Sequence, residues 1–168
     1  MIYYAIFIEL TKDLKNIVLN EKLKFLKFST TDLVNHPPHI TLLTFTNKSD
    51  NILNKFDFKP IDLMITNKDY FFDEQKTYTL FLNIKKNQEL KSLHYQSINL
   101  LNQEKNPILY EYIKSEWRPH ITIGQISNFE IAENFKSEQF NLKFKVNKLS
   151  YVKFENGKHL VLQEKKYD

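Results

Sequence analysis

The tetrapeptide Pro-His-Ile-Thr occurs twice in this chain, at residues 38–41 and at residues 119–122. In both copies, polar and apolar residues alternate, which is typical of a strand with one polar and one apolar face. The histidine and the threonine of each copy therefore point to the same side, with the isoleucine directed into the packing behind. These four polar residues are His39 and Thr41 in the first copy and His120 and Thr122 in the second.

An imidazole beside a hydroxyl is a combination suited to phosphodiester chemistry. Imidazole titrates near neutral pH, so it can accept a proton in one step and donate one in another. A neighbouring hydroxyl can donate a hydrogen bond to an anionic oxygen. Two such pairs facing each other would place an acid, a base and two oxygen ligands around one phosphodiester. A single His-x-Thr is usually a packing or surface feature, but two matching copies among only five histidines favour a functional site.

With these motifs the chain resembles the two-histidine (2H) phosphoesterases, which include the LigT-like RNA ligase and cyclic phosphodiesterase proteins. That family has two His-x-Thr/Ser motifs, one in each half of a pseudo-symmetric fold. Many members also have a hydrophobic N-terminal strand and a Lys/Arg-Pro pair before the second motif, which residues 1–10 and 118–119 match. Many relatives carry a basic residue shortly after the second motif, whereas this chain has Gly-Gln at 124–125.

The resemblance implies a fold, a substrate class and a mechanism. The expected fold is α+β, a single domain of two intertwined lobes over residues 1–168, with antiparallel sheets, outer helices and a central cleft that carries both motifs. The expected activity is a metal-independent phosphodiesterase without a cofactor, acting on RNA termini or small nucleotides with a 2′,3′-cyclic phosphate or a 2′–5′ linkage. One histidine would deprotonate water and the other would protonate the leaving oxygen, while Thr41 and Thr122 would hold the non-bridging oxygens. The sequence does not assign acid and base between His39 and His120.

Three residues near the second motif are candidates for substrate binding. Arg118 is the only arginine among the 24 basic residues, and it precedes His120 by two positions. Its planar fork of donors suits a phosphate group. Trp117, the only tryptophan, stands next to it, and Tyr112 is available for stacking on a base. We therefore expect Arg118, Trp117 and Tyr112 to contact the substrate.

Three other functions remain open from the sequence. The first is a cyclic-oligonucleotide phosphodiesterase that removes a defence second messenger, for which the aromatic and acidic residues 69–74, expected to form a loop, could stack on a base. The second is a non-catalytic RNA- or nucleotide-binding module, which the aromatic content of 14% and the basic balance would allow. A pure binder has little need for two His-Thr pairs. A zinc hydrolase comes last, because His36 and His39 flank two prolines and lack further ligands at suitable spacing.

Composition places the chain among ordinary globular proteins. It has 168 residues, 42% hydrophobic and 26% charged, enough for one domain with a sizeable core. The absence of cysteine excludes a disulfide scaffold, a thiol nucleophile and cysteine-ligated zinc. The net charge of +4 favours an anionic substrate. Residues 1–8 are apolar but too short for a membrane span, so we expect a cytoplasmic monomer that does not associate with membranes.

Hydrophobic spacing predicts strands and helices in alternation. The expected strands are residues 2–9, the two motif strands, 61–65, 78–84, 142–151 and 160–162. Three helices are expected: one that begins after Thr11, one over residues 88–104 and one within residues 128–138. Residues 22–28 alternate like a strand, so the end of the first helix is open. The parity of the apolar residues changes near Asn147 and Lys148, which predicts a bulge. Asn156 and Gly157 predict a hairpin turn.

Overall fold

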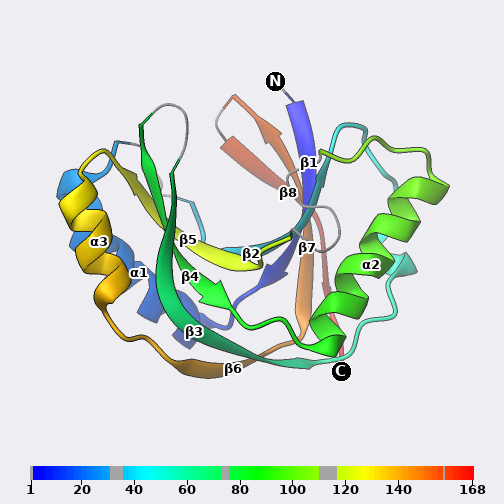
Figure 1. Ribbon diagram of the computed structural model, residues 1–168. Helices are drawn as coiled ribbons and strands as arrows, with labels where there is room; N and C mark the ends of the chain where they lie inside the picture. The colour runs from blue at the N-terminus through cyan, green and yellow to red at the C-terminus, as the bar shows by residue number, and fades with distance from the viewer. Residues whose placement is uncertain (1, 31–35, 73–75, 110–116, 157) are drawn as a thin grey trace.

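The computed structural model describes residues 2–30, 36–72, 76–109, 117–156 and 158–168, and its strands form two antiparallel four-stranded sheets (Figure 1). The strand order is β2-β1-β7-β8 in the first sheet and β5-β4-β3-β6 in the second. The first sheet consists of β1 (Ile2–Glu9), β2 (His39–Phe45), β7 (Lys148–Glu155) and β8 (Lys158–Lys166). The second consists of β3 (Ile61–Phe72), β4 (Tyr78–Ile84), β5 (His120–Ile126) and β6 (Leu142–Val146).

The helices lie close to their predicted positions. They are α1 (Lys12–Phe25), α2 (Gln88–Gln103) and α3 (Phe129–Ser137), with short 3₁₀ turns η1 (Leu26–Phe28) and η3 (Ile52–Lys55). Asparagine begins two of them. The side chain of Asn87 accepts a hydrogen bond from the backbone N–H of Leu90 at the start of α2, and Asn128 does the same for Ile131 in α3. Such caps satisfy backbone donors that the first helical turn leaves without a partner.

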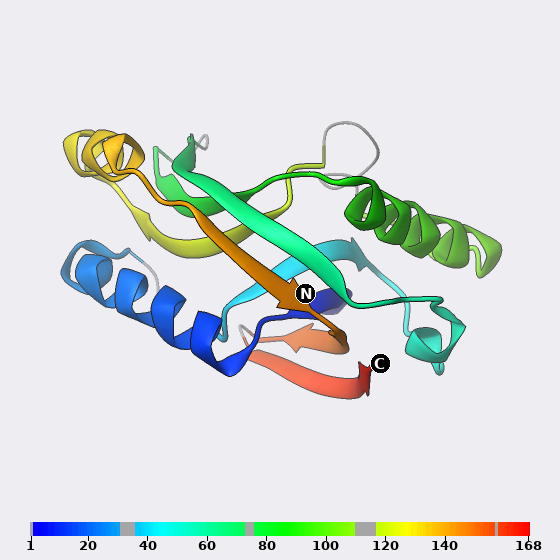
Figure 2. The same ribbon diagram turned by 90° about the horizontal axis from the view of Figure 1, so that it is seen from below.

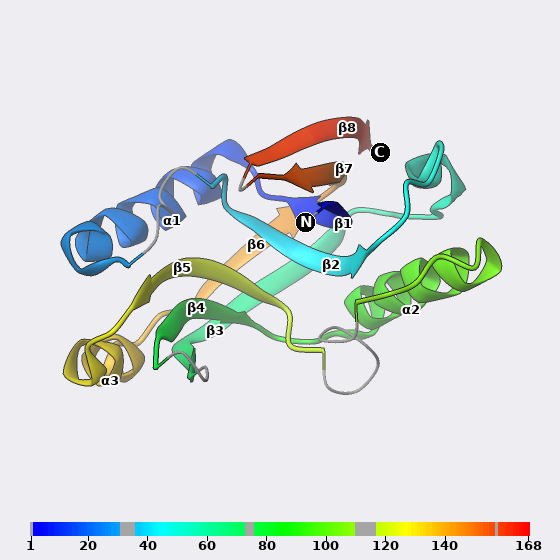
Figure 3. The same cartoon turned by 90° about the horizontal axis from the view of Figure 1, so that it is seen from above.

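The two sheets are related by a repeated unit of strand, helix and motif strand. The units are β1-α1-β2 and β4-α2-β5, and each motif strand is the edge strand of its sheet. Helix α1 packs against β5 of the second sheet, and α2 packs against β2 of the first (Figures 2 and 3). This exchange of helices between the sheets brings β2 and β5 into contact with each other. The expected α+β fold with two antiparallel sheets is confirmed.

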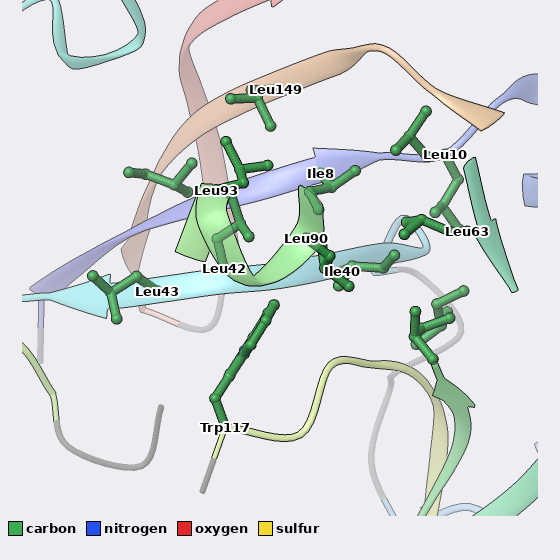
Figure 4. Close-up of a cluster of buried hydrophobic side chains, with 14 of the residues drawn as sticks. Ile8, Leu10, Ile40, Leu42, Leu43, Leu63, Leu90, Leu93, Trp117 and Leu149 are labelled. Carbon is green, nitrogen blue, oxygen red and sulfur yellow. The ribbon is translucent and has the colours of Figure 1, made fainter. Parts of the chain in front are cut away.

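Apolar residues from both sheets and from the helices share one core, part of which Figure 4 shows. Ile40 and Ile121, the isoleucines of the two motifs, are both 0% exposed within it. Because successive side chains of a strand point to opposite faces, burying these isoleucines turns the histidine and threonine on either side of them away from the core. The core therefore fixes the direction of both polar pairs.

The change of parity after Val146 has a different cause from the predicted bulge. The chain leaves the second sheet at the end of β6, which pairs with β3, and enters the first sheet as β7, which pairs with β1. Each strand presents its apolar side chains to its own surroundings, so the parity changes when the chain changes sheets. The prediction of a bulge near Asn147 and Lys148 was wrong, because local spacing does not reveal a change of partner strand.

Residues 22–28 are helical throughout, although their sequence alternates like a strand. Helix α1 runs to Phe25 and continues as η1. Leu14, Val18 and Phe25 follow helical spacing and are buried, whereas Leu23 is 55% exposed. The longer helical stripe therefore overrides the short alternating segment.

The aromatic and acidic segment that begins at Asp69 was also predicted wrongly as a loop. Residues 69–72 are the last four residues of strand β3 and pair with β4. Their side chains alternate in the manner of a strand: Tyr70 donates to Glu133 on α3, while Phe71 stacks on Phe81 of β4. Residues 73 and 74 lie outside the described residues.

Strands β7 and β8 pair antiparallel where the hairpin is predicted, with Glu155 opposite Lys158, and Gly157 lies outside the described residues. Asn156 has a φ of 51°, in the left-handed region that asparagine tolerates better than most residues.

Among the described helices, none is long and apolar enough to cross a membrane.

Candidate active site

The polar side chains of both motifs line one cavity of about 380 Å³. It lies where the two edge strands, β2 and β5, meet. The motif residues in its wall are His39, Thr41, His120 and Thr122. The first sheet adds aromatic side chains, helix α1 adds a lysine, and the segment before β2 adds a histidine. These further residues include Tyr3, Phe7, Phe154, Lys22 and His36.

The two motifs sit in the same backbone environment. In each sheet the motif threonine is opposite a phenylalanine of the neighbouring strand, and one extra residue follows the threonine as a bulge. The pairs are Thr41 with Phe7 and Thr122 with Phe81. The histidines are opposite different residues: Glu9 faces His39, and Asn83 faces His120. The repeat therefore holds for the backbone and the aromatic support but differs in charge beside the imidazoles.

Both motif histidines use the same ring nitrogen to bind the backbone. Nδ1 of His39 lies 2.8 Å from the carbonyl oxygen of Pro37, and Nδ1 of His120 lies 2.7 Å from that of Arg118. A carbonyl can only accept, so Nδ1 must carry the proton in each ring. In the neutral imidazole this leaves Nε2 as the acceptor, and in the imidazolium Nε2 becomes a donor. The backbone thus presets both rings for proton transfer through Nε2.

Aromatic rings hold both imidazoles in place. His39 stacks on Phe7 with ring centroids 3.5 Å apart and an interplanar angle of 15°. His120 contacts Phe71 at 5.3 Å and Phe81 at 5.2 Å, with steeper ring angles. These contacts limit rotation of the rings, so little reorganisation is needed before a proton moves.

Burial favours the neutral form of both histidines. It lowers the pKa of His39 to about 4, against the opposing effects of the Pro37 carbonyl and the Glu9 carboxylate. The charge of Lys22 lowers the pKa of His39 further. Burial also lowers the pKa of His120 from its ordinary value, and the carbonyl of Arg118 acts against this. Both rings are therefore able to accept a proton at neutral pH.

Arg118, expected to bind substrate, lies beside the second motif on a cluster of aromatic and acidic side chains. Its guanidinium is over the rings of Phe71 and Phe81 at 5.1 and 5.4 Å, and its Nη2 lies 3.1 Å from Asp69. Its side chain is 46% exposed. The same two phenylalanines contact His120. Arg118 is thus close to the second imidazole, with its charge already paired with Asp69.

Trp117, also expected to contact substrate, lies in the core and is 1% exposed (Figure 4). Its indole N–H donates to the carbonyl of Thr41 at 3.2 Å, and its ring stacks on His94 at 4.0 Å. Its observed contacts therefore support the first motif from behind. His94 of helix α2 is 1% exposed, and its Nδ1 binds the carbonyl of Leu42. Tyr112 lies outside the described residues.

Sequence reasoning missed Phe7, Phe81 and Lys22. Phe7 and Phe81 sit in apolar strands, and nothing local indicates which of their residues lie opposite a motif threonine. Lys22 carries a weak signal, because it continues the row of Leu14 and Val18 along the buried face of helix α1. Gln125, shortly after the second motif, donates from its side-chain amide to the hydroxyl of Thr79. Within the described residues, no group of three or more histidine or acidic side chains is placed to hold a metal ion.

The model of the 2′-5′ RNA ligase superfamily matches residues 20–158 of the sequence. The chain belongs to this superfamily. Its members are two-histidine phosphoesterases, so the resemblance drawn from the two motifs is confirmed. No curated protein sequence matches the chain.

Solved structures of similar fold agree over nearly the whole chain. E. coli LigT complexed with 3′-AMP has a TM-score of 0.69 at 12% identity, and TT0787 of Thermus thermophilus has 0.66 at 14%. Each alignment covers 98% of this chain and 97% of the other. Usb1 of Kluyveromyces marxianus has a TM-score of 0.56 at 8% identity, covering 96% and 97%. At these identities the similarity shows a shared fold.

Proposed function

We propose that the protein hydrolyses a phosphodiester at an RNA terminus or in a small nucleotide, with His39 and His120 dividing the acid and base roles. One observation carries the proposal: both imidazoles bind the backbone through Nδ1 and line the same cavity as Thr41 and Thr122. A pure binding site would gain little from two rings preset for proton transfer. Membership in a superfamily of phosphoesterases supports the same class of reaction.

The proposed reaction uses one water and one phosphodiester bond. One neutral histidine takes a proton from water through Nε2, and the water oxygen forms a bond to phosphorus. The bond from phosphorus to the leaving ribose oxygen breaks, and the other histidine, as imidazolium, gives its proton to that oxygen. The products are a phosphate monoester and a free hydroxyl. The hydroxyls of Thr41 and Thr122 donate to the non-bridging oxygens as negative charge builds on them.

The aromatic wall of the cavity supports a nucleotide as the substrate. Tyr3 and Phe154 stack with ring centroids 4.5 Å apart, and Phe7 meets Phe154 edge to face at 5.9 Å. Such surfaces stack on nucleobases of any kind. E. coli LigT, of similar fold, has been solved with 3′-AMP, ATP and NADP⁺. We therefore place the base toward the first sheet and the phosphodiester between the motifs, with a 2′,3′-cyclic phosphate or a 2′–5′ linkage as the scissile group.

The pH dependence of kcat/KM should have two limbs on the acid side of neutrality. The pKa of His39 is lowered to about 4, and that of His120 is lowered from 6.5. The rate should rise as pH increases through the lower of the two pKa values, about 4, and fall as pH increases through the upper one, which lies below 6.5. The limbs are the same whichever histidine is the acid. Steady-state kinetics between pH 3.5 and 9 would measure them, and a flat profile over that range contradicts a two-histidine mechanism.

Activity should survive chelation of divalent metals. Proton transfer by two imidazoles supplies both the nucleophile and the leaving-group proton without a Lewis acid. Hydrolysis of a nucleoside 2′,3′-cyclic phosphate should therefore proceed at the same rate, within about twofold, after dialysis against EDTA. Loss of turnover that zinc or manganese restores would assign the reaction to metal-assisted hydrolysis instead.

A further inference from the structure

Helix α1 places a buried lysine in the wall of the catalytic cavity. Leu14, Val18 and Lys22 follow one another at four-residue spacing on the face of the helix that packs inward, and all three are buried. Lys22 is 3% exposed and lines the cavity together with the four motif residues. Because α1 packs against β5 of the second sheet, this lysine reaches the site from a different direction from the motif strands.

A hydrogen bond to the backbone holds the amine of Lys22 beside the segment that leads into the first motif. Its Nζ donates to the carbonyl oxygen of His36 at 2.9 Å, three residues before His39. Lysine is almost never this deeply buried, because its ammonium loses hydration. On this helical face an apolar residue would continue the row of Leu14 and Val18 at no such cost. A lysine at this position therefore points to a function of its charge in the cavity.

We propose that Lys22 is a substrate-binding residue that contacts a phosphate oxygen on the His39 side of the cavity. This inference rests on the proposed function, because it requires a phosphate group between the motifs. Thr41 and Thr122 supply neutral donors, and Lys22 adds a full positive charge to the same cavity. A charged donor to phosphate is roughly twice as strong as a neutral one. Lys22 therefore contributes to the affinity for substrate and product, while His39 and His120 move the protons.

The ionisation of the site agrees with this role. Burial lowers the pKa of Lys22 to about 8, so the amine remains mostly protonated at pH 7. Its charge also helps to lower the pKa of His39, which places the cation near the imidazole. The carboxylate of Glu9, opposite His39, raises the pKa of His39, whereas His159 lowers it, as Lys22 does. An anionic phosphate bound beside Lys22 would offset this lowering of the His39 pKa and favour the imidazolium form of His39.

Calorimetric titration with adenosine 3′-monophosphate at pH 7 tests the inference. Lys22→Met keeps the length and the apolar stem of the side chain but removes the charge, and should weaken binding about 10–100-fold, the usual worth of a charged hydrogen bond. Lys12→Met is the matched control, because it removes one exposed charge from the same helix. Its affinity should stay within about twofold of the wild type. Unchanged affinity in Lys22→Met would overturn the role of Lys22 and leave the proposed function intact. A wild type that does not bind adenosine 3′-monophosphate would contradict both the role of Lys22 and the proposed function.

A measurement on the wild type covers the case in which Lys22→Met does not fold. Affinity for adenosine 3′-monophosphate should fall as pH rises through about 8, where Lys22 loses its proton. The other titratable groups lining the cavity are His36, His39, His120 and Tyr3. Histidines ordinarily titrate well below pH 8, both motif histidines have lowered pKa values, and burial raises the pKa of Tyr3. An affinity that stays constant between pH 7 and 9 would contradict the assignment to Lys22.

Discussion

Replacing either motif histidine with asparagine is expected to reduce kcat by roughly 100–10,000-fold, the usual contribution of a positioned acid or base. Asparagine can still donate to the carbonyl that now binds Nδ1, the oxygen of Pro37 or of Arg118. It cannot exchange a proton at the position of Nε2. The loss should therefore fall on kcat more than on KM, because the threonines and the aromatic wall still hold the substrate.

Replacing both His39 and His120 tests whether the two histidines act together. Groups that act as a unit are not additive, so replacing both should cost much less than the product of the two single losses. Circular dichroism and thermal unfolding of each variant would show whether the fold is kept. Two independent losses that multiply would show instead that the histidines act in separate steps or sites.

The motif threonines carry the second large expected effect. Thr41→Val and Thr122→Val keep the side-chain shape but remove the hydroxyl, and each should lower kcat about 10–1000-fold if the hydroxyl donates to charge that develops in the transition state. Thr46→Val is the matched control, because Thr46 is exposed just beyond the end of β2. It should leave kcat within about twofold of the wild type.

The kinetic constants of the threonine variants separate two roles. A donor that strengthens only in the transition state lowers kcat, whereas a donor that holds the substrate equally in both states raises KM. Wild-type values of both constants in Thr41→Val and Thr122→Val would assign the hydroxyls to the packing of the cavity wall.

The two motif strands and helix α2 were predictable from local patterns in the sequence. Alternation around Ile40 and Ile121 indicated two strands with polar faces, and the buried isoleucines explain why both polar pairs turn toward one cavity. The spacing of leucines predicted helix α2 to within one residue at its end. These signals are local, because the period of a strand or a helix is visible in a few neighbouring residues.

The features that the sequence did not reveal depend on partners distant in sequence. The parity change at Asn147 marks a change of sheet, which only the pairing of β6 with β3 and of β7 with β1 reveals. Trp117 adjoins the second motif, yet it packs in the core behind Thr41, because its indole contacts Thr41 of the first sheet and His94 of helix α2. Lys22 reaches the cavity only because α1 packs on the motif strand of the other sheet. Such contacts follow from the exchange of helices and leave little trace in the sequence.

Product analysis by chromatography tests most directly whether the cavity between the two motifs hydrolyses a phosphodiester by histidine acid–base chemistry. The wild type and the His39→Asn, His120→Asn double variant would be incubated with nucleoside 2′,3′-cyclic phosphates, with 2′–5′ and 3′–5′ dinucleotides and with cyclic oligonucleotides. We expect the wild type to convert at least one of these classes to a phosphate monoester, and the double variant to leave it unchanged over the same time. Conversion by the double variant at the wild-type rate would contradict the mechanism, and a wild type that binds these nucleotides without converting any of them would make the protein a binding module.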